Sequence, residues 1–219
     1  MKKVEWLACG TVEPMFRRLR FRVSGRKLRL FAVACWSRLR HLIAAELRGT
    51  LDLLERRADG LLTPREACEA GLGAWGVLTG LKLGPREREV CTRLTMAVAD
   101  PGAWHAAAAA SRTALDAAAW VGDWAVAAEE KAQCDLLREL FDPFRRPPRA
   151  RAAPPWAADR AVLGVADAVS EGRRFAELPV LADALEDAGC ADRELLNHLR
   201  GPGPHLPGCW ALDLVLGKA

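Results

Sequence analysis

The sequence is poor in the residues that favour β-strands. Its 219 residues include 14 Val, 7 Thr and a single Ile, Ile43, against 40 Ala. β-Branched side chains are stiff at χ1 and suit a pleated sheet, whereas Ala loses no side-chain entropy in a helix. Arg outnumbers Lys by 26 to 6, a bias that GC-rich codons also produce, so the assignment needs support from sequence pattern as well. Composition therefore predicts an all-α fold.

Long apolar runs are also absent. No segment reaches 18 uncharged apolar residues, the length of a membrane span, and the apolar stretch Val4–Ala8 is too short for a secretory signal. No Cys-x-x-Cys pair occurs, and an odd number of scattered cysteines argues against a disulfide framework. We therefore expect a cytoplasmic protein with no membrane partner. The seven cysteines are Cys9, Cys35, Cys68, Cys91, Cys134, Cys190 and Cys209.

Catalytic signatures are missing as well: the sequence has no GxSxG, HExxH or Walker-type motif. Gly71–Gly76 does match G-x-G-x-x-G, the dinucleotide fingerprint. That fingerprint requires a preceding strand, whereas this stretch lies inside a predicted helix, where its glycines would allow another helix to approach closely. The leading prediction is a non-catalytic protein-interaction or regulatory module, with an unidentified protein as partner and no cofactor. An enzyme is the less favoured interpretation.

What the chain does contain is apolar side chains at helical spacing. The clearest helix start is Thr63-Pro64-Arg65-Glu66, where Thr63 is the N-cap, Pro64 takes the first helical position and Glu66 completes a capping box. Ser24 is expected to cap another helix. The predicted helices cover residues 11–20, 25–45, 50–60, 64–80, 85–99, 156–171, 179–188 and 192–200, and a last apolar segment covers 209–216.

Residues 102–141 contain no proline and are rich in Ala. One long helix, kinked near Gly122, is the simplest prediction, and two helices are the alternative. Trp120 and Trp124 would lie one turn apart on the same face, with Trp104 upstream. We expect these tryptophans to pack in the core.

Residues 142–155, DPFRRPPRARAAPP, hold five prolines and four arginines and predict a linker or a surface strap. The chain then divides into a helical core region with the long Ala/Trp-rich helix (1–141), the linker (142–155) and a smaller C-terminal helical subregion (156–219). We expect an irregular multi-helix array in which the C-terminal subregion docks on the core region as one structural domain.

Charge is unevenly distributed along the chain. Residues 1–48 carry a net charge of +9 and the remainder −5. The basic part can pack against the acidic part, or it can bind nucleic acid or an acidic partner through contacts to phosphates. A nucleic-acid-associated protein is therefore an alternative function. Its binding residues would be Arg17, Arg18, Arg20, Arg22, Arg26, Lys27 and Arg29.

Two thiols and two imidazoles lie within 20 residues near the C-terminus: Cys190, His198, His205 and Cys209. They surround a Gly/Pro turn that can fold them together, and zinc accepts such sets in tetrahedral geometry. The spacing, C-x7-H-x6-H-x3-C, is not a recognised zinc pattern, and buried thiols with turn-bonded histidines are the competing interpretation. A zinc-binding protein or an enzyme using this cluster is the other alternative function, with zinc as its cofactor.

Residues 178–218, LPVLADALEDAGCADRELLNHLRGPGPHLPGCWALDLVLGK, resemble the C-terminal end of a large paralogous family of planctomycete bacteria. The resemblance continues in weaker form through RKLRLFAVACWSRLRHLI and QCDLLRELFDPFRRP. It implies a common fold and brings no activity with it. Members of that family often carry a cysteine directly after the histidine that corresponds to His198, whereas this chain has Leu199, so no role that needs that thiol carries over.

Overall fold

A computed structural model of the chain describes residues 1–20, 23–145 and 154–218. Within these ranges it contains twelve α-helices, four short 3-10 helices and no β-strand. The all-α, multi-helix prediction is confirmed. None of the helices in the described ranges has both the length and the apolar character that a bilayer crossing requires.

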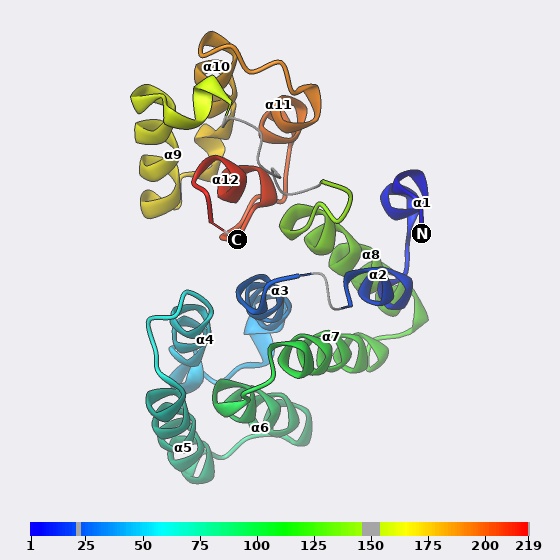
Figure 1. The fold of residues 1–219 in the computed structure, drawn as a ribbon. Helices are drawn as coiled ribbons and strands as arrows, with labels where there is room; N and C mark the ends of the chain where they lie inside the picture. The colour runs from blue at the N-terminus through cyan, green and yellow to red at the C-terminus, as the bar shows by residue number, and fades with distance from the viewer. Residues whose placement is uncertain (21–22, 146–153, 219) are drawn as a thin grey trace. The chain divides into compact units, whose positions relative to one another are not determined.

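The chain forms two compact units, Met1–Leu137 and Arg138–Ala219. The division falls within a helix, a few residues before the Pro/Arg-rich segment that was expected to separate them. Docking of the C-terminal part on the rest stays a prediction. The helices, labelled in Figure 1, are α1 (Lys3–Ala8), α2 (Val12–Leu19), α3 (Gly25–Arg38), α4 (Thr50–Ala58), α5 (Pro64–Gly80), α6 (Pro85–Ala99), α7 (Ala103–Ala119), α8 (Asp123–Leu140), α9 (Arg160–Gly172), α10 (Leu178–Asp187), α11 (Arg193–Arg200) and α12 (Trp210–Val215).

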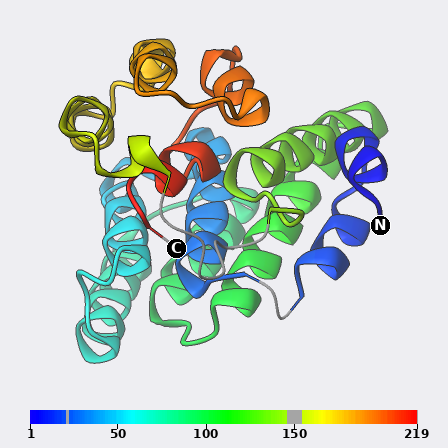
Figure 2. The same cartoon turned by 45° about the horizontal axis from the view of Figure 1, so that its top comes forward.

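The core of the first unit is organised around α3, which packs against α4 and α7 (Figures 1 and 2). Phe31, Cys35 and Trp36 of α3 are fully buried. This helix ends at Arg38, earlier than the predicted residue 45, and two 3-10 turns follow it. Leu39 and Ile43, which flank the first of these turns, are also buried, so the apolar spacing continues past the end of the helix and made the helix look longer.

The helix starts predicted from capping residues are confirmed. The Thr63 backbone N–H donates to Glu66 Oε2 at 2.8 Å, and the Glu66 N–H donates to Thr63 Oγ1 at 3.2 Å. Ser24 Oγ accepts from the Lys27 N–H. These bonds satisfy backbone donors that the first turn of a helix leaves without partners.

Residues 102–141 form two helices, α7 and α8, and not one. Gly122 lies between them with φ +145°, a backbone conformation that favours glycine, and the chain turns there. Trp120 and Trp124 therefore do not share a helix face. Trp124 is 72% exposed, so the prediction that it packs in the core is wrong. Trp120 is half-buried beside the Arg86 guanidinium, and Trp104 packs edge-on against a phenylalanine.

The glycines of the G-x-G-x-x-G match lie inside α5, which packs on α6. A Cβ on Gly71 would lie 3.3 Å from the Cβ of Ala99 on α6, so this glycine does allow a close helix approach. A Cβ on Gly73 or Gly76 would meet nothing within 4 Å. The structure thus gives a packing role to one of the three glycines, and among the described residues before the motif there is no strand, which a dinucleotide site requires.

The second unit has its own apolar core. In it α10 packs between α9 and α11, and α12 contacts α9 and α11 (Figure 1). Leu199 is fully buried in this core, so the position that departs from the family pattern has a packing role here. The buried residues of this core are Val162, Ala166, Val169, Leu178, Leu181, Ala182, Leu185, Cys190, Leu195, Leu196, Leu199, Cys209, Ala211, Leu212 and Val215.

Candidate metal centre

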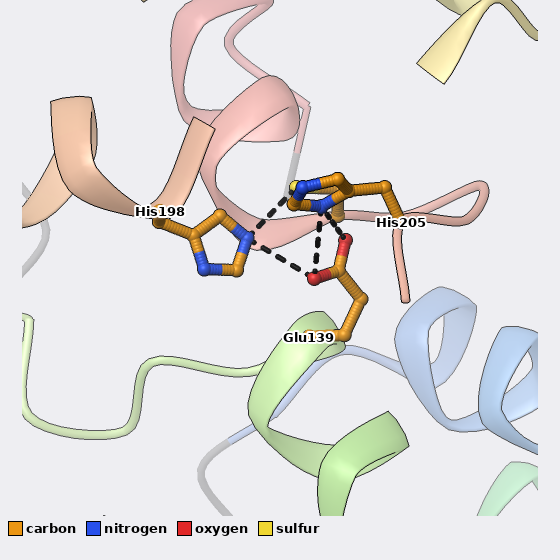
Figure 3. A group of neighbouring side chains, drawn as sticks. Glu139, His198 and His205 are labelled. Atoms are coloured by element: carbon orange, nitrogen blue, oxygen red, sulfur yellow. Dashed lines mark hydrogen bonds and ion pairs between the residues drawn. The ribbon is translucent and has the colours of Figure 1, made fainter. Parts of the chain in front are cut away.

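Four side chains of the second unit bring metal-binding atoms together. One donor atom from each of Glu139, His198, His205 and Cys209 lies within 4.8 Å of the other three. Figure 3 shows the Glu139 carboxylate, at the end of α8, pointing toward the two imidazole rings. His198 lies in the last turn of α11, His205 in the loop that follows, and Cys209 directly before α12. Such a group could hold a metal ion.

The loop between α11 and α12 places His205. Gly203 has φ +84°, and a Cβ at this position would lie 2.6 Å from the His205 backbone nitrogen, so glycine is required here. The His205 Nε2–H donates to the carbonyl oxygen of Gly201 at 3.0 Å. The ring is thereby oriented with Nδ1 toward Glu139, at 3.2 Å from Oε1.

Arg145 ties together the segments that supply the other donors. Its Nη1 donates to Asp192 at 2.7 Å, and Asp192 is the N-cap of α11, which carries His198. Its Nε donates to Asp142, three residues after Glu139. Its guanidinium also lies over the Trp210 ring, 4.9 Å from the centroid. One side chain thus contacts the segment after α8, the N-terminal end of α11 and the first residue of α12.

The Glu139 carboxylate accepts hydrogen bonds from both histidines. His198 Nε2 lies 3.1 Å from Glu139 Oε2 and 3.2 Å from Cys209 Sγ. Trp210 Nε1–H donates to His198 Nδ1 at 3.1 Å. Since an indole only donates, the ring proton of neutral His198 is on Nε2. His205 faces acceptors with both nitrogens, Gly201 and Glu139, which is the pattern of an imidazolium.

Burial and these neighbours shift the protonation equilibria. Burial opposes the charge of Glu139, but the hydrogen bonds from His198 and His205 prevail and lower its pKa below the ordinary glutamate value. The hydrogen bond to Glu139 raises the pKa of His205 despite the burial of the ring. Burial, together with the negative charge of Glu139, raises the pKa of the Cys209 thiol well above its ordinary value. These shifts favour a carboxylate at Glu139, a protonated ring at His205 and a thiol at Cys209.

The protein also offers partners to a Cys209 thiolate. The backbone N–H groups of Ala211 and Leu212, in the first turn of α12, hydrogen-bond Cys209 Sγ and act to lower its pKa, against the larger effect of burial. Such N–H groups stabilise a negative sulfur. If a cation replaced the thiol proton, these two backbone hydrogen bonds would already stabilise the thiolate.

The donor types match zinc. Zinc binds imidazole nitrogen and carboxylate oxygen at about 2.0 Å and thiolate sulfur at about 2.3 Å, so neighbouring donors of a tetrahedral site lie about 3.3–3.7 Å apart. Three contacts here, from His198 to Glu139, from His205 to Glu139 and from His198 to Cys209, are 3.1–3.2 Å, which is hydrogen-bond length and slightly below that range. Calcium and magnesium prefer all-oxygen sets. A mixed N, S and O set favours zinc among the common ions.

Three of the four predicted ligands are members of this group, and the fourth is not. Cys190 is buried in the apolar core of the second unit, and its backbone N–H donates to the carbonyl oxygen of Leu185. Glu139 takes the fourth position, and the sequence analysis did not identify it. One signal was available: Glu139 is a carboxylate among Leu136, Leu137 and Leu140, which are all buried. It also lies within the QCDLLRELFDPFRRP stretch that carries the family resemblance.

The basic residues proposed for nucleic acid belong to α2, α3 and the segment between these helices. Arg17 pairs with Glu13, Arg26 pairs with Asp59, and Arg29 donates to the backbone carbonyls of Asp100 and Pro101. Arg22 lies outside the described residues. Intramolecular contacts thus engage several members of the set, and nucleic-acid binding stays a prediction. Arg18, Arg20 and Lys27 complete the set, and they too have interaction partners.

No protein-family model, curated protein or solved structure matches the chain. Membership in the planctomycete family therefore stays a prediction from the C-terminal motif.

Proposed function

We propose that this chain is a non-catalytic zinc-binding module in which one zinc ion, bound by Glu139, His198, His205 and Cys209, stabilises the C-terminal unit. One observation carries the proposal: four donor atoms of the types that zinc prefers, one from the end of α8 and three from residues 198–209, lie within 4.8 Å of one another in a largely buried place. The metal would link the end of α8 to the loop between α11 and α12.

A structural role is favoured over a catalytic one because the protein supplies four ligands. Catalytic zinc sites keep a position open for water or substrate, whereas structural sites are closed by four protein ligands. Glu139 is 3% exposed and Cys209 is fully buried, so a substrate has little access to the ion.

Charge balance supports the exchange of protons for zinc. The metal-free group holds a carboxylate and an imidazolium, and its net charge is zero. Zinc with one carboxylate, one thiolate and two neutral imidazoles is also neutral, because two protons leave as one dication enters. Burying a neutral group avoids the desolvation cost of an uncompensated charge.

The second part of the proposal is that the module binds a protein partner or regulates one. Its support is an exposed apolar groove of about 250 Å³ between α5 and α6, which Leu72, Trp75 and Met96 help to line. Exposed apolar patches commonly mark interaction sites. The change Met96→Asp is expected to weaken binding of a partner that covers the groove and to leave zinc content unchanged, so the two parts of the proposal are separable.

Elemental analysis of the full chain tests the zinc site. After incubation with zinc and dialysis, the wild type should retain one zinc ion per chain. Cys209→Ser and His205→Ala should lose most of it, since each removes one ligand atom. Cys190→Ser is the matched control, because it changes a buried cysteine of the same unit that is not in the group, and it should retain one ion.

Two results would contradict the proposal. Wild-type protein without bound zinc contradicts the proposal. Equal loss in Cys190→Ser and Cys209→Ser also contradicts it, because it shows that the loss follows from damage to the core and not from removal of a ligand.

A further inference from the structure

The two histidines of the candidate metal centre differ in the hydrogen bond made by the ring nitrogen that would not bind the metal. A histidine that binds a metal through one ring nitrogen carries its proton on the other, and that N–H normally donates to a carbonyl or carboxylate oxygen. His205 meets this requirement, because its Nε2–H donates to the Gly201 carbonyl while Nδ1 faces the group. His198 does not, because its Nδ1, the nitrogen that does not face Glu139, accepts a hydrogen bond from a donor.

That donor is the indole of Trp210. Its Nε1–H points at His198 Nδ1 at 3.1 Å, and the two rings lie 4.8 Å apart between centroids. An indole N–H cannot accept a hydrogen bond. The arrangement therefore holds His198 with its proton on Nε2, which is the nitrogen that faces Glu139 and Cys209. Zinc on Nε2 would place the proton on Nδ1, so that two N–H groups would face each other at 3.1 Å.

We propose that Trp210 is a positioning residue that opposes zinc binding by holding His198 in the wrong tautomer, and that zinc entry releases the indole from His198. This inference rests on the proposed function. Trp210 acts only through His198, since it offers no ligand atom of its own. It lowers zinc affinity by the cost of breaking one hydrogen bond between buried or half-buried groups.

Arg145 also contacts the indole. The guanidinium lies 4.9 Å from the Trp210 ring centroid and pairs with Asp192 at 2.7 Å. A cation over an aromatic face is attracted by the ring. The indole therefore contacts both His198 and Arg145, and its release on zinc binding would alter the packing around Arg145.

Zinc affinity of Trp210→Phe tests the inference. Phenylalanine keeps an aromatic ring but removes the N–H, so His198 becomes free to place its proton on Nδ1. In competition with a chromophoric chelator, the full-length variant should bind zinc about five- to tenfold more tightly than the wild type. Trp156→Phe is the matched control: Trp156 packs at the edge of the same apolar core, and its replacement should leave the zinc affinity unchanged.

A second measurement uses the wild-type chain alone. Long-range ¹⁵N–¹H NMR spectra of histidine distinguish the two neutral tautomers. For His198 we expect a proton on Nε2 without zinc and on Nδ1 with zinc, together with a zinc-dependent change in tryptophan fluorescence that Trp210→Phe lacks.

The outcomes separate this inference from the proposed function. Stoichiometric zinc binding with equal or lower affinity in Trp210→Phe overturns the role of Trp210 and leaves the metal site standing. A His198 tautomer that zinc does not change overturns it as well. Failure of the wild type and of both variants to bind zinc overturns the proposed function itself.

Discussion

Helix α8 carries two buried glutamates whose surroundings differ in kind. Glu129, in the first unit, is 8% exposed, and its carboxylate accepts from Arg38 at 2.7 Å and from Gln133 at 2.9 Å. Glu139, in the second unit, is 3% exposed and faces two imidazoles and a thiol. An arginine is charged at every physiological pH, whereas imidazoles and thiols exchange their protons. The charge of Glu129 is balanced by Arg38 at every physiological pH. The groups around Glu139 could instead release protons and bind a metal ion with it.

The polar network around Glu129 combines the ion pair to Arg38 with hydrogen bonds. Gln133 donates to the Ser111 carbonyl oxygen and accepts from the Ser111 hydroxyl. Every member of this network has a partner within the first unit, as a buried polar group requires. A buried carboxylate therefore marks a candidate metal site only when the groups around it can also act as ligands.

Removal of metal should produce the largest difference between the two units. At free zinc about 1,000 times the dissociation constant, a bound ion contributes about 4 kcal/mol to the free energy of unfolding. We expect EDTA to raise amide hydrogen exchange in α9 to α12 and to leave α3 to α7 unchanged, as measured by mass spectrometry of peptides from each unit. Equal changes in both units, or none in the second, would contradict the proposed site.

Breaking the polar network around Glu129 should destabilise the first unit and leave the metal site of the second unit unchanged. Glu129→Gln removes the charge that pairs with Arg38 and should lower the free energy of unfolding of the first unit by about 2 kcal/mol, less than for a fully buried pair because Arg38 is partly exposed. Denaturant unfolding with elemental analysis measures both effects, and zinc content should stay at that of the wild type. Glu130→Gln, at a half-buried neighbour, is the control, and a zinc loss in Glu129→Gln would remove the distinction between the two glutamates.

The smallest effect concerns the glycines of α5. Gly73→Ala places a methyl group in open space within a helix and should raise the stability of the first unit by about 0.5–1 kcal/mol, because alanine restricts the unfolded chain. Gly71→Ala should gain less or lose stability, since its Cβ would lie 3.3 Å from Ala99. Thermal unfolding of both variants is sufficient, and equal changes would mean that Gly71 is not held at a close helix contact.

The sequence predicted the helices well where capping residues and apolar spacing agree, as at Thr63 and Ser24. It failed where one signal was missing. The Ala-rich stretch 102–141 has little apolar periodicity, so only the conformation of Gly122 shows that the helix is broken there. In 25–45 the apolar spacing extends beyond the helix, because Leu39 and Ile43, which come after its last residue Arg38, are also buried.

The candidate site shows a similar limit. His198, His205 and Cys209 were predicted together because they are close in sequence around a turn. Cys190 was included for the same reason, yet its position after α10 places it in the apolar core. Glu139 was not identified, because it is distant in sequence and only the tertiary structure brings it to the histidines. Proximity along the chain finds the ligands of one loop and cannot find a ligand from another helix.

The order of the donor atoms along the chain gives the centre a further property. Three of them come from one short stretch, residues 198–209, and Glu139 precedes that stretch by about sixty residues. A metal bond to Glu139 would therefore close a long loop of chain, and closing a loop of that size removes unfolded-state entropy worth about 4 kcal/mol when the link is a disulfide. A coordinate bond at this point would act as a reversible crosslink, which forms and breaks with the supply of metal, in a chain whose described residues contain no disulfide.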